Sequence, residues 1–73
     1  MSKNIFGSNL KRLRLEKNMT QQQLADKIMI STANICRWEK GDSYPQIIWV
    51  YIIAKALEVN PEELIILQNT KKR

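Results

Sequence analysis

The sequence predicts an all-α domain that consists of five helices. Three observations lead to this prediction: apolar residues recur at helical spacing, residues that begin or end helices stand between these stretches, and only two Gly and two Pro occur among the 73 residues. The hydrophobic share of 44% is typical of a chain that buries a core. We expect one domain at residues 1–67 and a short basic tail at 68–73.

The first predicted helix begins near Phe6. Phe6, Leu10 and Leu13 recur at i, i+4 and i+7, which places them on one face of an amphipathic helix. Asn18 follows, and Asn is second only to Gly at the left-handed position that ends many helices. We therefore expect this helix to end close to Asn18.

The second predicted helix begins after Thr20. Thr20 and Gln23 have the spacing of a capping box, in which each of the two side chains accepts a hydrogen bond from the backbone amide of the other residue. A short apolar stripe follows, so this helix spans only about two turns. Its members are Leu24, Ala25 and Ile28.

The third predicted helix starts only three residues after Ile28, with Ser31 as its N-cap. Ile35 and Trp38 point inward from it, and Gly41 stands at its C-terminal end. Two short helices with so few residues between them cannot lie antiparallel. They must cross at a steep angle, which is the geometry of a helix-turn-helix.

A turn-rich connection at 41–46 leads to residues 47–57, which are apolar nearly all round. The β-branched and aromatic residues at 47–53 also suit a buried strand, but a lone strand would have no partner, and residues 54–57 favour a helix. On this helix one side, predicted to face the core, consists of Ile47, Val50, Ile53, Ala54 and Leu57. The opposite side consists of Ile48, Ile52 and Ala56, with Trp49 at its border.

The last predicted helix runs through Leu67. Asn60 is its expected N-cap, Pro61 its first helical residue, and an acidic residue completes the cap.

The charge of the chain favours an anionic partner only weakly. Twelve Lys and Arg stand against seven Asp and Glu, which gives +5. Lys71, Lys72 and Arg73 supply three of these charges, so the rest of the chain is only slightly basic.

Enzymatic activity is not expected. The chain has no His, one cysteine (Cys36), no Gly-rich phosphate loop and no nucleophile elbow. The sequence thus offers no catalytic residues, no metal ligands and no cofactor site. The longest apolar run, 47–54, is far shorter than the roughly 18 residues of a membrane helix. The start, MSKNIFG, lacks the apolar core of a signal peptide, so we expect a cytoplasmic protein.

Three stretches of the chain resemble the phage-repressor and Cro-like helix-turn-helix regulators, also called lambda-repressor-like or XRE-type. They are LKRLRLEKNMTQQQLADKI, STANICRWEKG and YPQIIWVYIIAKALEVNPEEL, and the likeness runs from about Phe6 to Leu67. The pattern T-Q-x-x-L-A followed by I-x-R-W-E-x-G is specific at this spacing. The resemblance implies a five-helix domain that binds double-stranded DNA, with the second and third helices as the reading unit.

Four residues of the third helix are the expected base-reading residues: Thr32, Ala33, Asn34 and Arg37. The guanidinium fork of Arg37 matches the two acceptors of guanine, the Thr32 hydroxyl can serve several bases, and the Ala33 methyl can touch a thymine methyl. Asn34 lies off their common side. A solvated charge or a phosphate clamp is the alternative role for Arg37.

Five further residues are expected at DNA phosphates: Gln21, Lys40, Ser43, Thr20 and Ser31. The resemblance places Gln21 at the N-terminus of the second helix, where free amides and the helix dipole attract an anion. Thr20 and Ser31 act first as helix caps.

Arg14 and Glu39 match positions that often pair in the family, and such a pair would orient the third helix. The alternative is two independent surface charges. The chain departs from the family at two turns. Members of the family usually carry Gly there, whereas this chain has Met29 and Glu58. If both keep left-handed backbone, each costs about 1 kcal/mol relative to Gly.

The resemblance and the second apolar face of the fourth helix together predict a homodimer. A helix that is apolar all round must be covered all round. The expected interface comprises Ile48, Trp49, Ile52, Ala56, Ile65 and Ile66. Shielding by the basic tail or by the last helix is the alternative.

The leading hypothesis is a dimeric Cro-like or repressor-like protein that acts on a two-fold operator. A transcriptional activator, such as the controller of a restriction-modification operon, fits the same sequence and would also contact RNA polymerase. An antitoxin-like module that binds a toxin-like protein as well as DNA is a third hypothesis, although only residues 68–73 follow the last predicted helix.

Overall fold

The computed structural model describes residues 5–66 of the protein. Within this range the chain forms five helices and no strand: α1 (Ile5–Glu16), α2 (Gln21–Ile28), α3 (Thr32–Lys40), α4 (Ile47–Leu57) and α5 (Glu62–Ile65). The predicted all-α class is therefore confirmed. The predicted domain end at Leu67 and the basic tail lie outside the described residues. Among the described helices, none combines the length and the apolar character that a membrane crossing requires.

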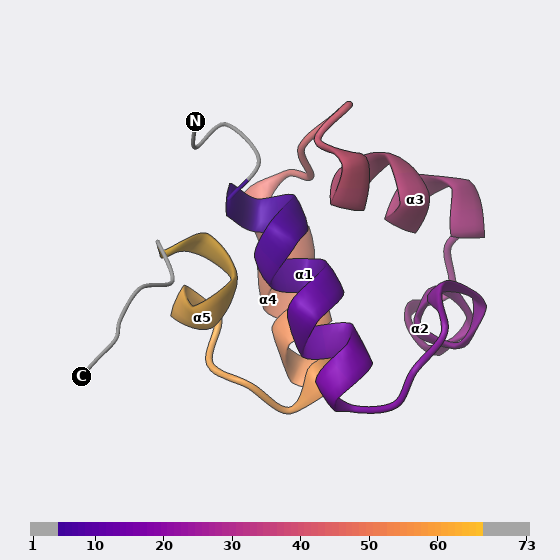
Figure 1. Ribbon diagram of the computed structural model, residues 1–73, viewed down its shortest axis with the longest axis horizontal. Helices are drawn as coiled ribbons and strands as arrows, with labels where there is room; N and C mark the ends of the chain where they lie inside the picture. Colours follow the sequence, from indigo (N-terminus) through magenta and orange to yellow (C-terminus); the bar gives the residue numbers. More distant parts are fainter. Residues whose placement is uncertain (1–4, 67–73) are drawn as a thin grey trace.

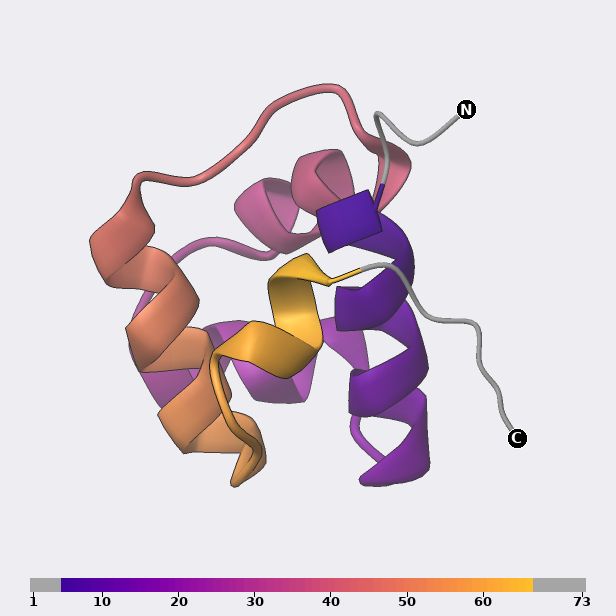
Figure 2. The same ribbon diagram turned by 90° about the vertical axis from the view of Figure 1, so that its left-hand side faces the viewer.

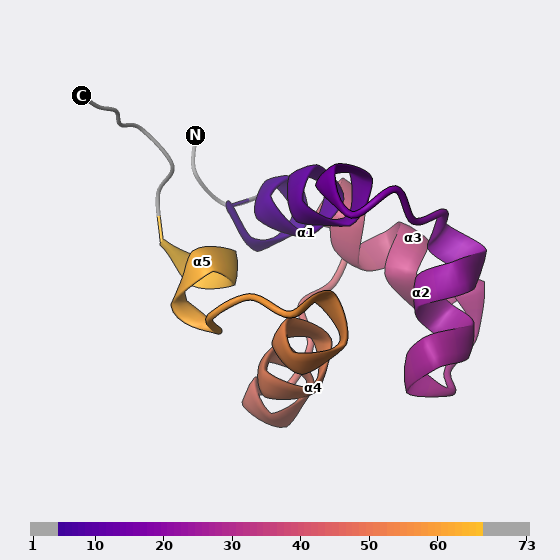
Figure 3. The ribbon, with the colours of Figure 1, turned by 90° about the horizontal axis from the view of Figure 1, so that it is seen from below.

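Helix α1 lies in the middle of the fold, with α2 and α3 on one side of it and α5 on the other (Figures 1 and 3). It packs against α3 and α5, while α2 packs against α3 and α4. Helices α2 and α3 cross steeply, and the connection at 41–46 carries the chain from α3 to the start of α4 (Figures 1 and 2). Among the described residues, the other helices contact α3 on its inner side.

The core draws apolar side chains from all five helices, at the spacings that the sequence predicts for α1, α2 and α3. Its buried members are Phe6, Leu10, Leu13, Leu24, Ala25, Ile28, Ile35, Trp38, Val50, Ile53, Ala54, Leu57 and Leu64. The ring of Trp38 joins three helices. Its centroid lies 6.4 Å from that of Phe6 in an edge-to-face contact and 6.2 Å from that of Trp49.

The start of α2 has the predicted capping box. The Thr20 hydroxyl accepts from the Gln23 amide at 3.0 Å, and the Gln23 side chain accepts from the Thr20 amide at 2.8 Å. The prediction for Ser31 is wrong in its detail, because its side chain makes no capping hydrogen bond. Only the backbone of Ser31 caps the start of α3. This backbone is extended, and its carbonyl accepts from the Asn34 amide at 3.1 Å.

Four helices end in left-handed backbone at the positions that the sequence indicates. The φ angles are 60° at Asn18, 65° at Met29, 83° at Gly41 and 61° at Glu58. Met29 and Glu58 therefore have a backbone conformation that carries a steric cost for any residue with a Cβ atom and none for Gly.

The start of α4 differs from the prediction. Ile47 was expected in the core, but 62% of its side chain is exposed. As the first residue of α4 it lines a shallow hollow with Tyr44 and Ile65 instead of entering the core. Trp49, expected at the border of the outer face, is half-buried because its ring packs against Trp38.

Helix α5 starts later and ends earlier than predicted. Its first helical residue is Glu62, and Asn60 contributes backbone groups to the cap instead of its side chain. The Asn60 amide donates to the Glu63 carboxylate at 3.1 Å, so Glu63 is the capping acid. At the other end, Ile66 has extended backbone, and Leu67 lies outside the described residues.

The buried side chain of Asn9 explains the end of α5. Its amide donates to the carbonyl of Leu64 at 3.0 Å and to that of Ile66 at 2.8 Å. These carbonyls would otherwise lack a partner at a helix C-terminus. A side chain of α1 thus takes the place of another helical turn.

Replacement of Glu58 by Gly should stabilise the fold. The change removes the steric cost of left-handed backbone, and the greater freedom of Gly in the unfolded chain offsets part of the gain. We expect the free energy of unfolding to rise by about 0.5–1 kcal/mol, measured by urea denaturation. Glu58→Ala is the matched control, because Ala keeps the strain and should give no gain. Equal stability of the Gly and Ala variants would contradict the argument.

Candidate nucleic-acid interface

The position of α3 is fixed by a buried ion pair with α1. The Nε of Arg14 lies 2.6 Å from one carboxylate oxygen of Glu39, and its Nη2 lies 3.0 Å from the other. Both side chains are less than a tenth exposed. This two-point contact sets the rotation of α3 as well as its distance, because the guanidinium and carboxylate planes must match.

The same ion pair extends to the beginning of α2. The Nη1 of Arg14 donates to the Met19 carbonyl at 2.7 Å, in the turn before α2. The side-chain amide of Gln21, the first residue of α2, donates to Glu39 at 3.0 Å. One buried carboxylate therefore ties three helices together, and Gln21 takes part in this network from the position predicted to lie near phosphate.

The outer face of α3 is not covered by other described helices. Ala33, Arg37 and Lys40 are exposed there, at i, i+4 and i+7. Thr32 and Asn34 are half-buried beside them. The Nη2 of Arg37 donates to the Asn34 side-chain oxygen at 2.8 Å, so Asn34 holds the guanidinium along the helix.

Helix α2 also reaches the start of α3 through a second, exposed set of side chains. The Thr32 hydroxyl lies 2.8 Å from the side-chain oxygen of Gln22. The amide nitrogen of Gln22 donates to the Asp26 carboxylate, also at 2.8 Å. Neither Gln22 nor Asp26 is among the site residues that the sequence predicts. Their i, i+4 spacing on one helix was a usable signal, whereas the contact with Thr32 depends on the crossing of α2 and α3.

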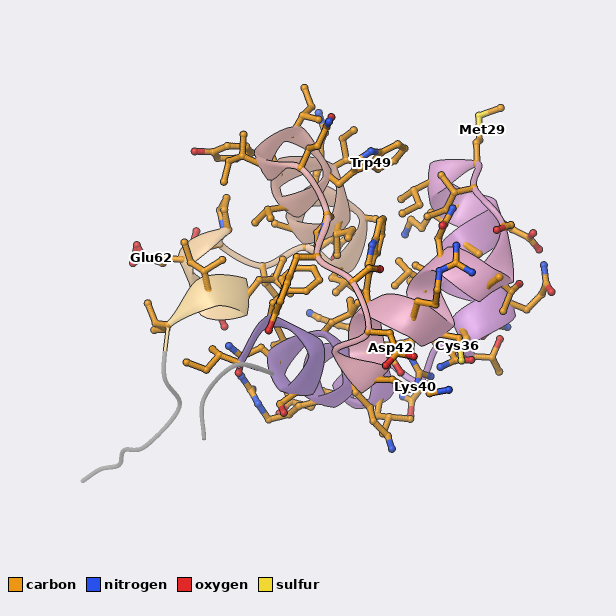
Figure 4. The ribbon with its side chains drawn as sticks, turned by 90° about the horizontal axis from the view of Figure 1, so that it is seen from above. Met29, Cys36, Lys40, Asp42, Trp49 and Glu62 are labelled. Atoms are coloured by element: carbon orange, nitrogen blue, oxygen red, sulfur yellow. The ribbon has the colours of Figure 1, made fainter. Side chains whose placement is uncertain are left out.

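Lys40, the last residue of α3, pairs with Asp42 in the connection that follows. The ammonium group of Lys40 lies 3.8 Å from the Asp42 carboxylate. Figure 4 labels both residues at the end of α3. Both side chains are mostly exposed, and such a surface pair contributes at most about 1 kcal/mol, so Lys40 can exchange Asp42 for another anion. Ser43 is half-buried, and the capping residues Thr20 and Ser31 are exposed.

The residues predicted for a dimer interface divide into two groups. Ile48, Ile52, Ile65 and Ile66 are exposed apolar side chains, whereas Trp49 and Ala56 are half-buried. Ile47 and Tyr51 of α4 are exposed as well. The exposed apolar side of α4 therefore includes these two residues, whereas Ala56 lies at its margin.

Comparisons with known proteins agree with this geometry. The family described as Helix-turn-helix matches residues 10–64, which include α2, the turn and α3. The chain is 38% identical to the HTH-type transcriptional activator BcrR of Enterococcus faecalis, over 93% of this chain and 36% of the activator. It is 36% identical to the uncharacterized HTH-type transcriptional regulator y4dJ of Sinorhizobium fredii (strain NBRC 101917 / NGR234), over 84% of this chain and 79% of that regulator.

Helices α2 and α3 cross steeply, and the outer face of α3 is not covered by other described helices. Both helices lie inside the region that the family matches. Together these findings define the class of protein. The chain belongs to the Cro-like, XRE-type helix-turn-helix family, which consists of transcriptional regulators rather than enzymes. The chain spans only about a third of the length of the Enterococcus activator that it matches.

The buried pair should show strong energetic coupling. In a double-mutant cycle with Arg14→Met and Glu39→Leu, each single variant leaves one charge buried without its partner, while the double variant leaves none. We expect a coupling energy of at least about 1 kcal/mol from thermal unfolding. The exposed pair Lys40–Asp42 is the control, and its coupling should be near zero. Additive effects at Arg14 and Glu39 would mean that the pair does not fix α3.

Proposed function

We propose that this protein binds double-stranded DNA in a sequence-specific manner and regulates transcription as a homodimer on a two-fold operator. The observation that carries the proposal is the bare outer face of α3, held in place by the buried Arg14–Glu39 pair. An α-helix fits the major groove of B-DNA, where every base pair presents its own pattern of donors and acceptors. A rigidly oriented helix with short polar side chains and one Arg on its free side suits that groove.

In this proposal Arg37 reads guanine through its guanidinium fork, and Asn34 supports it through their 2.8 Å hydrogen bond. Thr32 and Ala33, in the first turn of α3, contact neighbouring bases. Gln21, Thr20 and Ser31, at the starts of α2 and α3, lie beside the sugar-phosphate backbone, where helix N-termini favour an anion. Lys40, the last residue of α3, and Ser43, in the connection that follows, contact phosphate.

The exposed side of α4 supplies the proposed dimer interface. Ile47, Ile48, Tyr51 and Ile52 expose apolar surface there. Ile65, the last residue of α5, and Ile66, which follows it, add to this surface. Two copies of one helix face can meet across a two-fold axis, since such an interface pairs a surface with itself. The same symmetry presents two recognition helices to DNA about one turn, roughly 34 Å, apart.

Repression in the manner of Cro is the leading form of regulation in this proposal. Activation is the second candidate, and the identity with a protein named as a transcriptional activator favours it. Selection of duplexes from a random DNA pool, followed by footprinting at the protein's own promoter, distinguishes the two by where the operator lies relative to the promoter.

Arg37 and Lys40 should affect DNA binding in different ways. Arg37→Ala should cost about 1–3 kcal/mol at one base position and relax its specificity. Lys40→Ala should weaken binding to all sequences and reduce the salt dependence by about one unit of slope. Affinities for the selected duplex and for random DNA at several salt concentrations separate these effects. Equal losses on both duplexes for Arg37→Ala would contradict base reading by Arg37.

A charge on the exposed side of α4 should break the dimer. Ile48→Glu should give a folded monomer in sedimentation, with much weaker operator binding, because an ionised carboxylate cannot be buried unpaired in an apolar interface. Leu15→Glu is the matched control, because Leu15 of α1 is similarly exposed (53% against 57%) but lies on another helix. A wild-type monomer at tens of micromolar, or normal operator binding by Ile48→Glu, would contradict this interface.

A further inference from the structure

Two hydrogen bonds of the Gln22 side chain, one within α2 and one to α3, fix the direction in which the Thr32 hydroxyl points its proton. A carboxylate can only accept hydrogen bonds, so the Gln22 group that faces Asp26 at 2.8 Å must be the amide nitrogen. The side-chain oxygen of Gln22 therefore faces Thr32, at 2.8 Å from its hydroxyl. Because that oxygen is also only an acceptor, Thr32 must donate its single hydroxyl proton to Gln22.

A hydroxyl whose proton is engaged in this way retains only its lone pairs for other partners. A free Thr hydroxyl can serve any base, as donor or acceptor, and so selects weakly. The Thr32 hydroxyl can only accept, and in the major groove the donors are the exocyclic amino groups of adenine and cytosine.

We propose that Asp26, acting through Gln22, determines which base Thr32 selects, by making its hydroxyl an acceptor for the amino group of adenine or cytosine. The inference rests on the proposed DNA-binding function and adds a specificity determinant that itself touches no base. Asp26 is a positioning residue in this scheme. Contact with DNA also removes the water that competes for these exposed groups, which strengthens the arrangement on binding.

The test uses the duplex that the full chain selects from a random DNA pool. The base pair that Thr32 contacts is identified as the one at which the Thr32→Val variant no longer discriminates between bases. At this base pair, adenine is replaced by purine, or cytosine by pyrimidin-2-one, which removes the exocyclic amino group. Wild-type affinity should fall about three- to tenfold, the value of one hydrogen bond, while that of Thr32→Val should not change.

Asp26→Asn should abolish this sensitivity. An Asn amide can donate to the Gln22 oxygen, which lets the Gln22 amide turn and frees the Thr32 proton for bases with acceptors. We expect binding of Asp26→Asn to become insensitive to removal of the amino group, with a preference shifted toward guanine or thymine at that position. Asp26→Glu retains a carboxylate and should keep the wild-type preference.

A charge-matched control separates this effect from a general change in electrostatics. Glu62→Gln removes the same charge from α5, on the opposite side of the molecule from α2 and α3, and should keep the wild-type preference (Figures 1 and 4). Circular dichroism of each variant reports on folding.

Two results would overturn the inference while leaving the proposed function intact. They are wild-type binding that is insensitive to removal of the amino group, and unchanged base preference in a folded Asp26→Asn variant. Failure of the wild-type chain to select any sequence would overturn both the inference and the proposed function.

Discussion

The buried contact between Arg14 and Glu39 is the interaction on which the rest of the structure depends. The guanidinium and the carboxylate meet at two points in the interior, at 2.6 and 3.0 Å, and neither could remain there alone without a large desolvation cost. Apolar residues of similar size could hold α1 and α3 together as well. The ion pair adds direction, since it also engages the Met19 carbonyl and Gln21 and so aligns the start of α2 with α3.

Rigidity at this point contrasts with strain at two turns. Met29 and Glu58 both hold left-handed backbone without being Gly, and the Met29 side chain projects into solvent beyond the end of α2 (Figure 4). The backbone of each turn is nevertheless closed by hydrogen bonds from the cap amide to carbonyls of the preceding helix. The packing of α2 and α4 thus compensates for the local cost.

Local rules of sequence predicted most of the fold. Apolar spacing located the helices, and the capping box at Thr20 and the left-handed residues marked where several of them begin or end. The missing side-chain cap at Ser31 is a local difference, but two other differences depend on how distant segments pack. The end of α5 depends on Asn9, which lies 55 residues from Leu64, and the exposure of Ile47 depends on where α4 begins relative to the core. For the candidate site, the i, i+4 spacing of Gln22 and Asp26 could be read from the sequence, but the contact of Gln22 with Thr32 depends on the crossing of α2 and α3.

The Asn9 amide also determines how the two ends of the fold behave as a unit. It binds the carbonyl of Leu64 inside α5 and that of Ile66 just after it, and so closes a loop of nearly the whole domain. The entropic cost of closing a loop rises with its length, and contacts so distant in sequence favour slower folding. They also carry load: a pull applied to the chain at Ile66 passes through the Asn9 amide to α1, the helix whose Arg14 orients α3.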